Sequence, residues 1–224
     1  MRKFLRDNGL SLGFGLLFLL ALVGQAFAGN ADLNHRRLAD GGDPVGLWDF
    51  VVSSDFAVDV AENWQSEYLQ FFLYVLATVW LVQRGSPESK PVGRVGAESD
   101  ADQKVGRHAD EDSPRWARVG GWRTGLFSTS LGLVMGGLFA LSWLAQSVAG
   151  VSAYNNQQLI DFQDTASWGQ YVLSADFWNR SLQNWQSEFL AIGSMAILSV
   201  FLRQRGSPES KPVGASHTVT DESG

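Results

Sequence analysis

The sequence predicts an all-α integral membrane protein with four transmembrane helices, arranged as two tandem helix–loop–helix repeats. Three observations predict this fold: long apolar runs without charge, a string of residues that occurs twice, and basic residues confined to alternate connections. The uncharged apolar runs cover residues 10–28, 68–82, 124–153 and 189–202. Since a helix needs about 20 residues to cross the hydrocarbon core, we expect spans at about residues 8–28, 64–83, 126–149 and 185–204.

The repeat is exact in two places. The five residues Asn63 to Glu67 recur letter for letter at Asn184 to Glu188, 121 positions later, and residues 83–93 recur unchanged at 204–214. We call the first pair the motif segments and the second pair the stop segments. Two units of equal length imply one supersecondary unit used twice. Because each unit has two spans, both units sit the same way up, and the sequence predicts a parallel repeat with its pseudo-two-fold axis along the membrane normal.

The boundaries of the domains follow from the repeat. Residues 1–93 form the first membrane unit and residues 122–214 the second. Residues 94–121 are rich in charged and small side chains with little to bury, so we expect a flexible cytoplasmic linker, and residues 215–224 a disordered tail. Gly and Pro in the stop segments are typical of a helix end. Between the first two spans, Ser53 or Ser54 is expected to cap a helix that begins at Ser54.

The N-terminus resembles a cleaved secretory signal. Basic residues precede the first apolar run, and Ala26-Phe27-Ala28 has the pattern of a cleavage site. However, its counterpart at residues 124–150 has the same pattern in the middle of the chain, where it indicates a span. We therefore expect the first helix to be retained.

The distribution of charge predicts the orientation. The net charge is −6, yet the basic residues concentrate before the first run, between the second and third runs, and after the fourth; the other connections hold only Arg36, Arg37 and Arg180. The positive-inside rule then places both termini and the linker in the cytoplasm. We expect the lipid bilayer as a partner, together with a second copy or another membrane protein. In this acidic chain the basic residues serve as membrane anchors, so nucleic acid is not an expected partner.

The sequence offers little catalytic chemistry. It contains no cysteine, and its three histidines, His35, His108 and His217, are scattered without a partner at the spacing of metal ligands. Nucleotide-binding loops and nucleophile motifs are absent from the sequence. We therefore expect no catalytic residue, no metal and no cofactor.

The motif segments supply the candidate polar site: Asn63, Gln65, Glu67, Asn184, Gln186 and Glu188. Asn63 and Glu67 are four residues apart and share a helix face. An ionisable residue at membrane depth is costly, so two such carboxylates that meet across the pseudo-two-fold axis could hold a proton or a cation. Alternatively, each Glu lies about one turn from the outer surface, hydrated near a helix N-terminus. Trp64 and Trp185 are interpreted as anchors at the membrane interface.

The stop segments have two interpretations. Ser86 and Ser207 each precede a proline, which is consistent with a docking or phosphorylation segment. A helix stop with a basic cytoplasmic anchor explains Arg, Gly, Pro and Lys, but not why Glu88, Ser89 and Val92 also recur.

Three stretches carry a resemblance to a known family: the N-terminal MRKFLRDNGLSL, the motif NWQSEYLQ at residues 63–70, and the stop QRGSPESKP. The chain resembles a family of bacterial membrane proteins, common in actinobacteria and other soil bacteria, that has no assigned function. The resemblance covers both repeats and implies a polytopic inner-membrane protein. Gln65 and Gln186 stand where relatives are expected to have an acidic residue, which argues against an obligatory proton carrier there.

The expected function is that of a non-enzymatic inner-membrane protein with a structural or interaction role in the envelope. The alternative is a small proton- or cation-coupled transporter or channel that uses Glu67 and Glu188. Four spans make a thin conduit, so this alternative would need a dimer.

Overall fold

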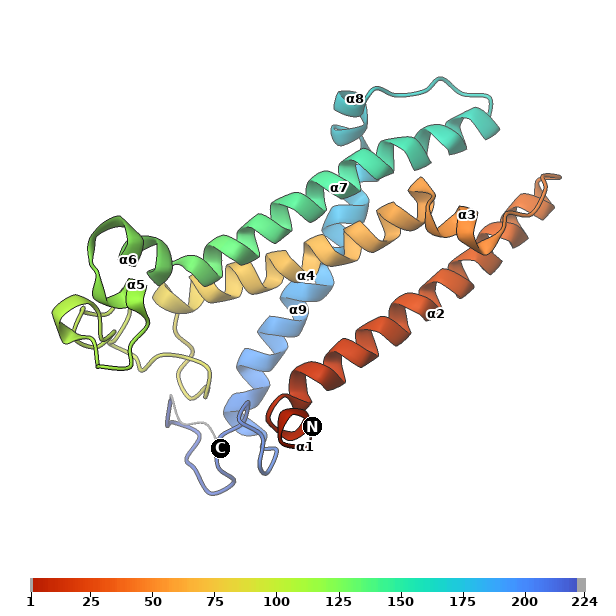
Figure 1. The fold of residues 1–224 in the computed structure, drawn as a ribbon. Coiled ribbons are helices and arrows are strands. Elements are labelled where there is room, and N and C mark those ends of the chain that lie inside the picture. Colours follow the sequence, from red (N-terminus) through yellow and green to blue (C-terminus); the bar gives the residue numbers. More distant parts are fainter. Residues whose placement is uncertain (1, 221–224) are drawn as a thin grey trace. The chain divides into compact units, whose positions relative to one another are not determined.

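The computed structural model describes residues 2–220. In this part of the chain all regular structure is helical (Figure 1), which confirms the all-α prediction. The helices are α1 (Arg2–Asp7), α2 (Gly9–Ala39), α3 (Leu47–Val51), α4 (Ser54–Trp80), η1 (Gly106–His108), α5 (Arg115–Arg118), α6 (Gly121–Ser128), α7 (Ser130–Ile160), α8 (Trp168–Val172) and α9 (Ala175–Phe201). Residues 221–224 of the expected tail lie outside the described residues.

Three pairs of helices have matching bounds. Helices α2 and α7 have 31 residues each, α3 and α8 have 5, and α4 and α9 have 27. In each pair both ends are 121 positions apart. The caps match as well: the N–H of Phe56 donates to Ser53 Oγ at 3.3 Å, and the N–H of Phe177 donates to Ser174 Oγ at 3.3 Å. The expected start of α4 at Ser54 is confirmed, and of the two candidate caps, Ser53 and Ser54, the structure shows Ser53.

Two helices could cross a membrane. Among the described residues, α2 and α7 have the required length and mean hydropathy, with values of 2.1 and 1.6 over their most apolar windows. In these windows none of the α2 residues and 22% of the α7 residues are buried, whereas the core helix of a soluble protein is mostly buried. Helices α4 and α9 do not pass this test, because each includes a motif segment and acidic residues in its N-terminal half.

The two long helices extend further than expected. We expected membrane spans that end near residues 28 and 149, and the helices that contain these stretches continue to Ala39 and Ile160. Polar residues form these last turns, and in α2 they are supported by an ion pair between Asp32 and Arg36 at 3.0 Å. A pair spaced four residues apart on a helix stabilises it locally, a contribution that a search for apolar runs does not detect.

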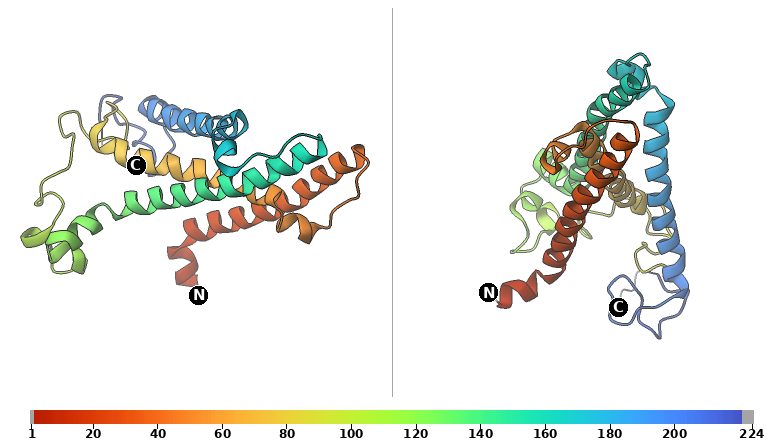
Figure 2. Two further views of the ribbon diagram at one scale, coloured as in Figure 1. Left: turned by 90° about the horizontal axis from the view of Figure 1, so that it is seen from above. Right: turned by 90° about the vertical axis from the view of Figure 1, so that its right-hand side faces the viewer.

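The chain divides into two compact units. Unit 1 comprises Met1–Ala61 with Ala145–Val172, and unit 2 comprises Glu62–Leu144 with Leu173–Gly224. In unit 1, each loop after a long helix turns back and places a short helix against it: α3 on α2 and α8 on α7 (Figures 1 and 2).

An asparagine on each long helix fixes the returning loop of unit 1. Asn34 Nδ2 donates to the carbonyl of Val45 at 2.9 Å, and its Oδ1 accepts from the N–H of the same residue at 2.6 Å. Asn155 makes the same two bonds with Ala166, at 2.9 and 2.8 Å. One asparagine side chain therefore satisfies both backbone groups of a loop residue in each repeat, which explains why this asparagine recurs.

A glycine on each long helix receives the aromatic ring of the short helix. Phe50 on α3 and Tyr171 on α8 are both almost fully buried. A Cβ atom on Gly29 would lie 2.7 Å from the Phe50 ring, and one on Gly150 would lie 2.4 Å from the Tyr171 hydroxyl. These distances are too short for a side chain, so both positions need glycine.

Unit 2 packs α4 and α9 with the first part of α7. On α7, Gly136 leaves room for the ring of Phe72 on α4, since a Cβ atom at Gly136 would approach that ring to 2.9 Å. A cluster of aromatic rings centres on Trp143 of α7, which stacks on Phe177 of α9 at a centroid distance of 5.9 Å. Trp143 Nε1 also donates to the buried Ser181 hydroxyl at 3.3 Å.

The expected linker and tail contain ordered local structure. Within residues 94–121 the structure has η1, α5 and the start of α6, held by short-range hydrogen bonds such as Thr124 Oγ1 to the carbonyl of Trp116 at 2.6 Å. The tail is held as far as residue 220, because the buried Lys211 ammonium donates to the carbonyls of Ser216, His217 and Val219. Local hydrogen bonding of this kind leaves no trace in composition, which was the basis of the two expectations.

Candidate functional site

The two motif segments meet in unit 2 through a glutamine and a tryptophan. Gln65 of α4 is fully buried, and its Oε1 accepts a hydrogen bond of 2.7 Å from Nε1 of Trp185 on α9. The Trp185 ring also contacts those of Phe139 and Trp143, at centroid distances of 6.4 and 5.8 Å. Trp185, expected to anchor the protein in the headgroup layer, thus directs its N–H to a protein partner. Trp64, the other expected anchor, is exposed.

The two expected carboxylates have different surroundings. Glu67 is exposed, whereas Glu188 is half-buried and interacts with the Ser66 hydroxyl and with the electrostatic field of Glu67. The Ser66 hydroxyl also lies 2.9 Å from the carbonyl of Asn63. A hydroxyl has a single proton, so Ser66 donates to one of these two acceptors at a time.

The remaining motif residues break the symmetry of the repeat. Asn63 is exposed, and its counterpart Asn184 donates from Nδ2 to the carbonyl of Arg180 at 3.0 Å. Gln186 is exposed, although its counterpart Gln65 is fully buried. The structure therefore brings Gln65 together with Trp185 and Ser66 together with Glu188, whereas Asn63 and Gln186 are exposed.

Further polar contacts join α4 to α9 on both sides of this bond. Arg180 on α9 forms an ion pair with Glu62 on α4 at 3.1 Å. Further along, Gln70 Nε2 donates to the backbone carbonyl of Glu188 at 3.4 Å. Together with the Gln65–Trp185 bond, they form a ladder of polar contacts between the two helices.

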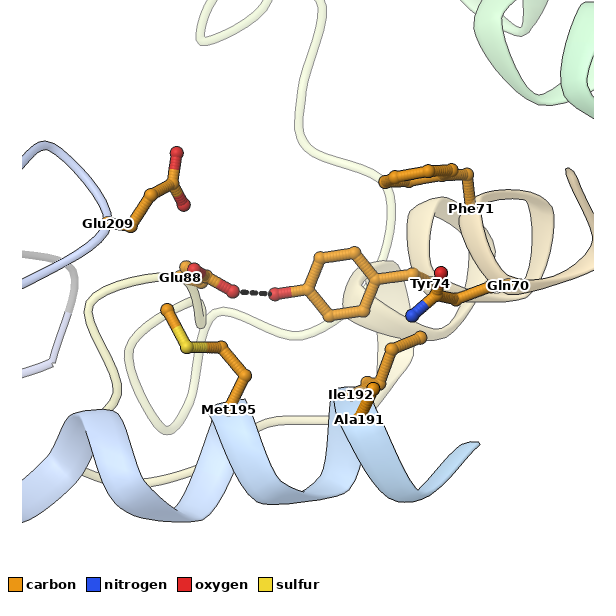
Figure 3. A pocket seen from close by; sticks show the side chains of 8 residues that line it. All are labelled: Gln70, Phe71, Tyr74, Glu88, Ala191, Ile192, Met195 and Glu209. Atoms are coloured by element: carbon orange, nitrogen blue, oxygen red, sulfur yellow. Dashed lines mark hydrogen bonds between the residues drawn. The ribbon is translucent and has the colours of Figure 1, made fainter. Parts of the chain in front are cut away.

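A pocket in unit 2 is lined by equivalent positions of the two repeats (Figure 3). It has a volume of about 340 Å³, and we call it the paired pocket. Its lining consists of four pairs 121 positions apart: Gln70 with Ala191, Phe71 with Ile192, Tyr74 with Met195, and Glu88 with Glu209. The first three pairs come from α4 and α9, and the fourth comes from the stop segments.

Two carboxyl groups face the paired pocket. The Tyr74 hydroxyl donates to Glu88 Oε2 (Figure 3). Glu209 lies near the same glutamate, and the proximity of the Glu88 carboxyl group raises the pKa of Glu209 above its ordinary value. Two close carboxyl groups favour a state in which one of them keeps its proton.

The stop segments fold identically and position these carboxyl groups. The Oγ atoms of Ser89 and Ser210 accept from the N–H groups of Gln83 and Gln204 at 2.8 and 2.9 Å. The hydroxyl of the preceding serine in each segment accepts from the N–H of Glu88 or Glu209, at 3.3 and 3.2 Å. These bonds account for the recurring serines. Ser86 is also buried, which favours the helix-stop interpretation over phosphorylation for that copy.

Sequence reasoning missed the paired pocket. The available signal was the recurrence of Glu88 as Glu209 within an otherwise basic helix stop, which had no explanation. The search for charge at membrane depth led instead to Glu67 and Glu188. Among the described residues, no group of three or more His, Asp or Glu side chains could hold a metal ion.

The comparisons with known proteins give one match. A family model described as a domain of unknown function, DUF6766, matches residues 1–222. No curated protein and no solved structure matches the chain. The family match thus covers both repeats, the linker and nearly all of the tail.

Proposed function

The chain belongs to the DUF6766 family, and from this premise we propose that it is a non-enzymatic bacterial inner-membrane protein with a structural or interaction role in the envelope. In this proposal α2, α4, α7 and α9 all cross the membrane as two parallel repeats. Both termini and the linker lie in the cytoplasm. The partner is the bilayer, with a second copy or another membrane protein beside it.

Matching helix bounds support four spans. Since α4 has the same length as α9 and α2 the same length as α7, each repeat provides one strongly apolar helix and one amphipathic helix. An amphipathic helix can cross a bilayer when its polar groups find partners on another helix. The ladder between α4 and α9 provides such partners, and the basic residues flank each stop segment on the cytoplasmic side.

The observation that carries the structural role is the bond between Gln65 and Trp185. These residues belong to the most strictly repeated stretch of the two spans, and they join α4 to α9. In a bilayer a buried amide and an indole N–H favour each other as partners because water is absent. In this proposal the repeated motif serves to assemble the helices.

A deletion strain tests the structural role. We expect weakened survival of osmotic shock, restored by the wild type and by the Glu67→Gln, Glu188→Gln double variant. A variant that breaks the helix contact, Gln65→Ala with Trp185→Phe, should fail to restore it, although it should still be inserted. The structural role would be rejected if the Gln65→Ala, Trp185→Phe variant restored survival of osmotic shock and the Glu67→Gln, Glu188→Gln variant did not.

The paired pocket favours a second candidate function, transport coupled to protons or cations. Its two carboxyl groups, Glu88 and Glu209, join Glu67 and Glu188 as candidate carriers. The raised pKa of Glu209, caused by the nearby Glu88 carboxyl group, supports this candidate.

Ion flux in reconstituted vesicles separates the two candidate functions. Wild-type protein is compared with the Glu67→Gln, Glu188→Gln variant and with the Glu88→Gln, Glu209→Gln variant, each checked for folding. Proton or cation movement that either variant loses would establish transport and identify the pair that carries it. Absence of flux from all three proteins is the result expected for a structural role.

A further inference from the structure

The segment between the linker and α7 forms a small basic and aromatic surface. Helices α5 and α6 pack together through the bond from Thr124 to the carbonyl of Trp116, and the rings of Trp116 and Trp122 meet edge to face at 6.4 Å. Between them lies a pocket of about 350 Å³, which we call the Arg–Trp pocket; it is lined by Arg115, Trp116, Val119, Trp122 and Arg123. All five side chains are exposed.

The two charged residues that line the Arg–Trp pocket, Arg115 and Arg123, are both positive. In the part of the chain that the structure describes, neither Arg115 nor Arg123 belongs to an ion pair. The Arg123 guanidinium lies 5.5 Å from the centroid of the Trp122 ring, and Arg118 turns away to the carbonyl of Glu111. The sequence from residue 113 to residue 160 contains no acidic residue. The pocket therefore presents two exposed arginines, neither of them in an ion pair within the described residues, to an anionic ligand.

The position of the pocket indicates where that partner comes from. One residue separates α6 from α7, one of the two helices that could cross a membrane. Trp122, Leu126 and Phe127 on α6 are exposed apolar side chains. Tryptophan prefers the headgroup level of a bilayer, and arginine binds phosphate through its fork of N–H donors. The anionic lipid headgroup is the phosphate source that lies at this depth.

We propose that Arg115 and Arg123 bind the phosphate of an anionic phospholipid of the cytoplasmic leaflet, with Trp116 and Trp122 beside its glycerol region. This inference rests on the proposed function, because it requires α7 to cross the membrane from the cytoplasmic side. The bound lipid fixes the level at which the second repeat enters the bilayer.

Lipid retention by the purified full chain tests the proposal. Protein in neutral detergent is titrated with phosphatidylglycerol or phosphatidylcholine, and bound lipid is counted by native mass spectrometry. The Arg115→Gln, Arg123→Gln variant is compared with Arg94→Gln, Arg107→Gln, which removes the same charge from exposed linker positions. We expect the pocket variant to bind phosphatidylglycerol roughly 30-fold more weakly, or about 2 kcal/mol, while the linker variant and all binding of phosphatidylcholine stay unchanged.

Two results would contradict lipid binding at the Arg–Trp pocket. The first is an equal loss of affinity for phosphatidylglycerol in the pocket and linker variants, which would show general attraction by net charge. The second is a wild type that does not prefer phosphatidylglycerol to phosphatidylcholine. An Arg115→Lys, Arg123→Lys variant checks folding and should retain part of the affinity, because lysine keeps the charge without the planar fork. Release of the wild type from membranes by alkaline carbonate would instead reject the membrane-spanning premise, independently of the lipid result.

Discussion

At the scale of single residues, identical letters have different environments in the two repeats. Gln65 is buried against Trp185, whereas Gln186, its counterpart, is exposed. The sequence identified the motif and its candidate residues but not this difference, since both copies have the same neighbours along the chain. The difference comes from the surroundings: Trp143, which packs on Trp185, has leucine as its counterpart at position 22.

The two glutamines form a matched pair for mutation. Gln65→Ala leaves the indole N–H of Trp185 without its partner and removes buried volume, so we expect a loss of about 1–3 kcal/mol in the free energy of unfolding. Gln186→Ala, at an exposed position, should change that free energy by no more than about 0.5 kcal/mol. Denaturant unfolding in detergent measures both values. Equal destabilisation by the two substitutions would show that Gln65 is not the joining residue.

The pKa of Glu209 predicts a pH dependence. A raised pKa means that the folded state holds the proton more tightly, so the contact between the stop segments is strongest below the ordinary glutamate value of 4.5 and weakens as pH rises through the raised pKa. In Glu209→Gln this dependence should flatten, with a melting temperature at pH 7 equal to or above that of the wild type. Thermal unfolding between pH 4.5 and pH 8 provides the test. An unchanged pH dependence of the melting temperature in the variant would contradict the raised pKa of Glu209.

At the scale of elements, local signals predicted the helix starts better than the helix ends. The start of α4 and its two candidate caps, Ser53 and Ser54, were predicted from residue type and position, because capping is a local interaction. Both α2 and α7 continue beyond the expected spans, since a search for apolar runs does not detect their polar last turns. The recurrence of Asn34 as Asn155 was visible in the sequence, but its role required the loop geometry.

Glycine at the contact between α7 and α8 is a requirement of packing. Gly150→Ala places a methyl group against the buried Tyr171, so we expect a loss of about 1–3 kcal/mol in unfolding free energy. The control is Gly137→Ala in the same helix, where nothing lies within 4 Å of the added atom; there we expect no loss, or a gain of up to about 1 kcal/mol from helix propensity. Calorimetry measures the unfolding free energies of the two variants. No loss in Gly150→Ala would contradict the close contact between Gly150 and Tyr171.

At the scale of the whole molecule, charge and hydropathy support four spans to different extents. The asymmetry of basic residues predicts four crossings with both termini in the cytoplasm. Hydropathy alone identifies α2 and α7, because α4 and α9 carry polar residues that require partners on another helix. The mean hydropathy of one helix takes no account of such partners. A helix whose polar groups are paired with a neighbouring helix therefore has a lower mean hydropathy than a helix that faces lipid.

The crossing of α4 and α9 is the central claim, and single-cysteine labelling tests it most directly. The chain has no cysteine, so one can be introduced at a time at Asp43, Ala101, Asp164 or Gly214. We predict that a membrane-impermeant maleimide labels positions 43 and 164 from outside intact cells, and labels positions 101 and 214 only after lysis. Labelling of positions 43 and 101 from outside intact cells, with positions 164 and 214 labelled only after lysis, would show that α4 and α9 do not cross the membrane.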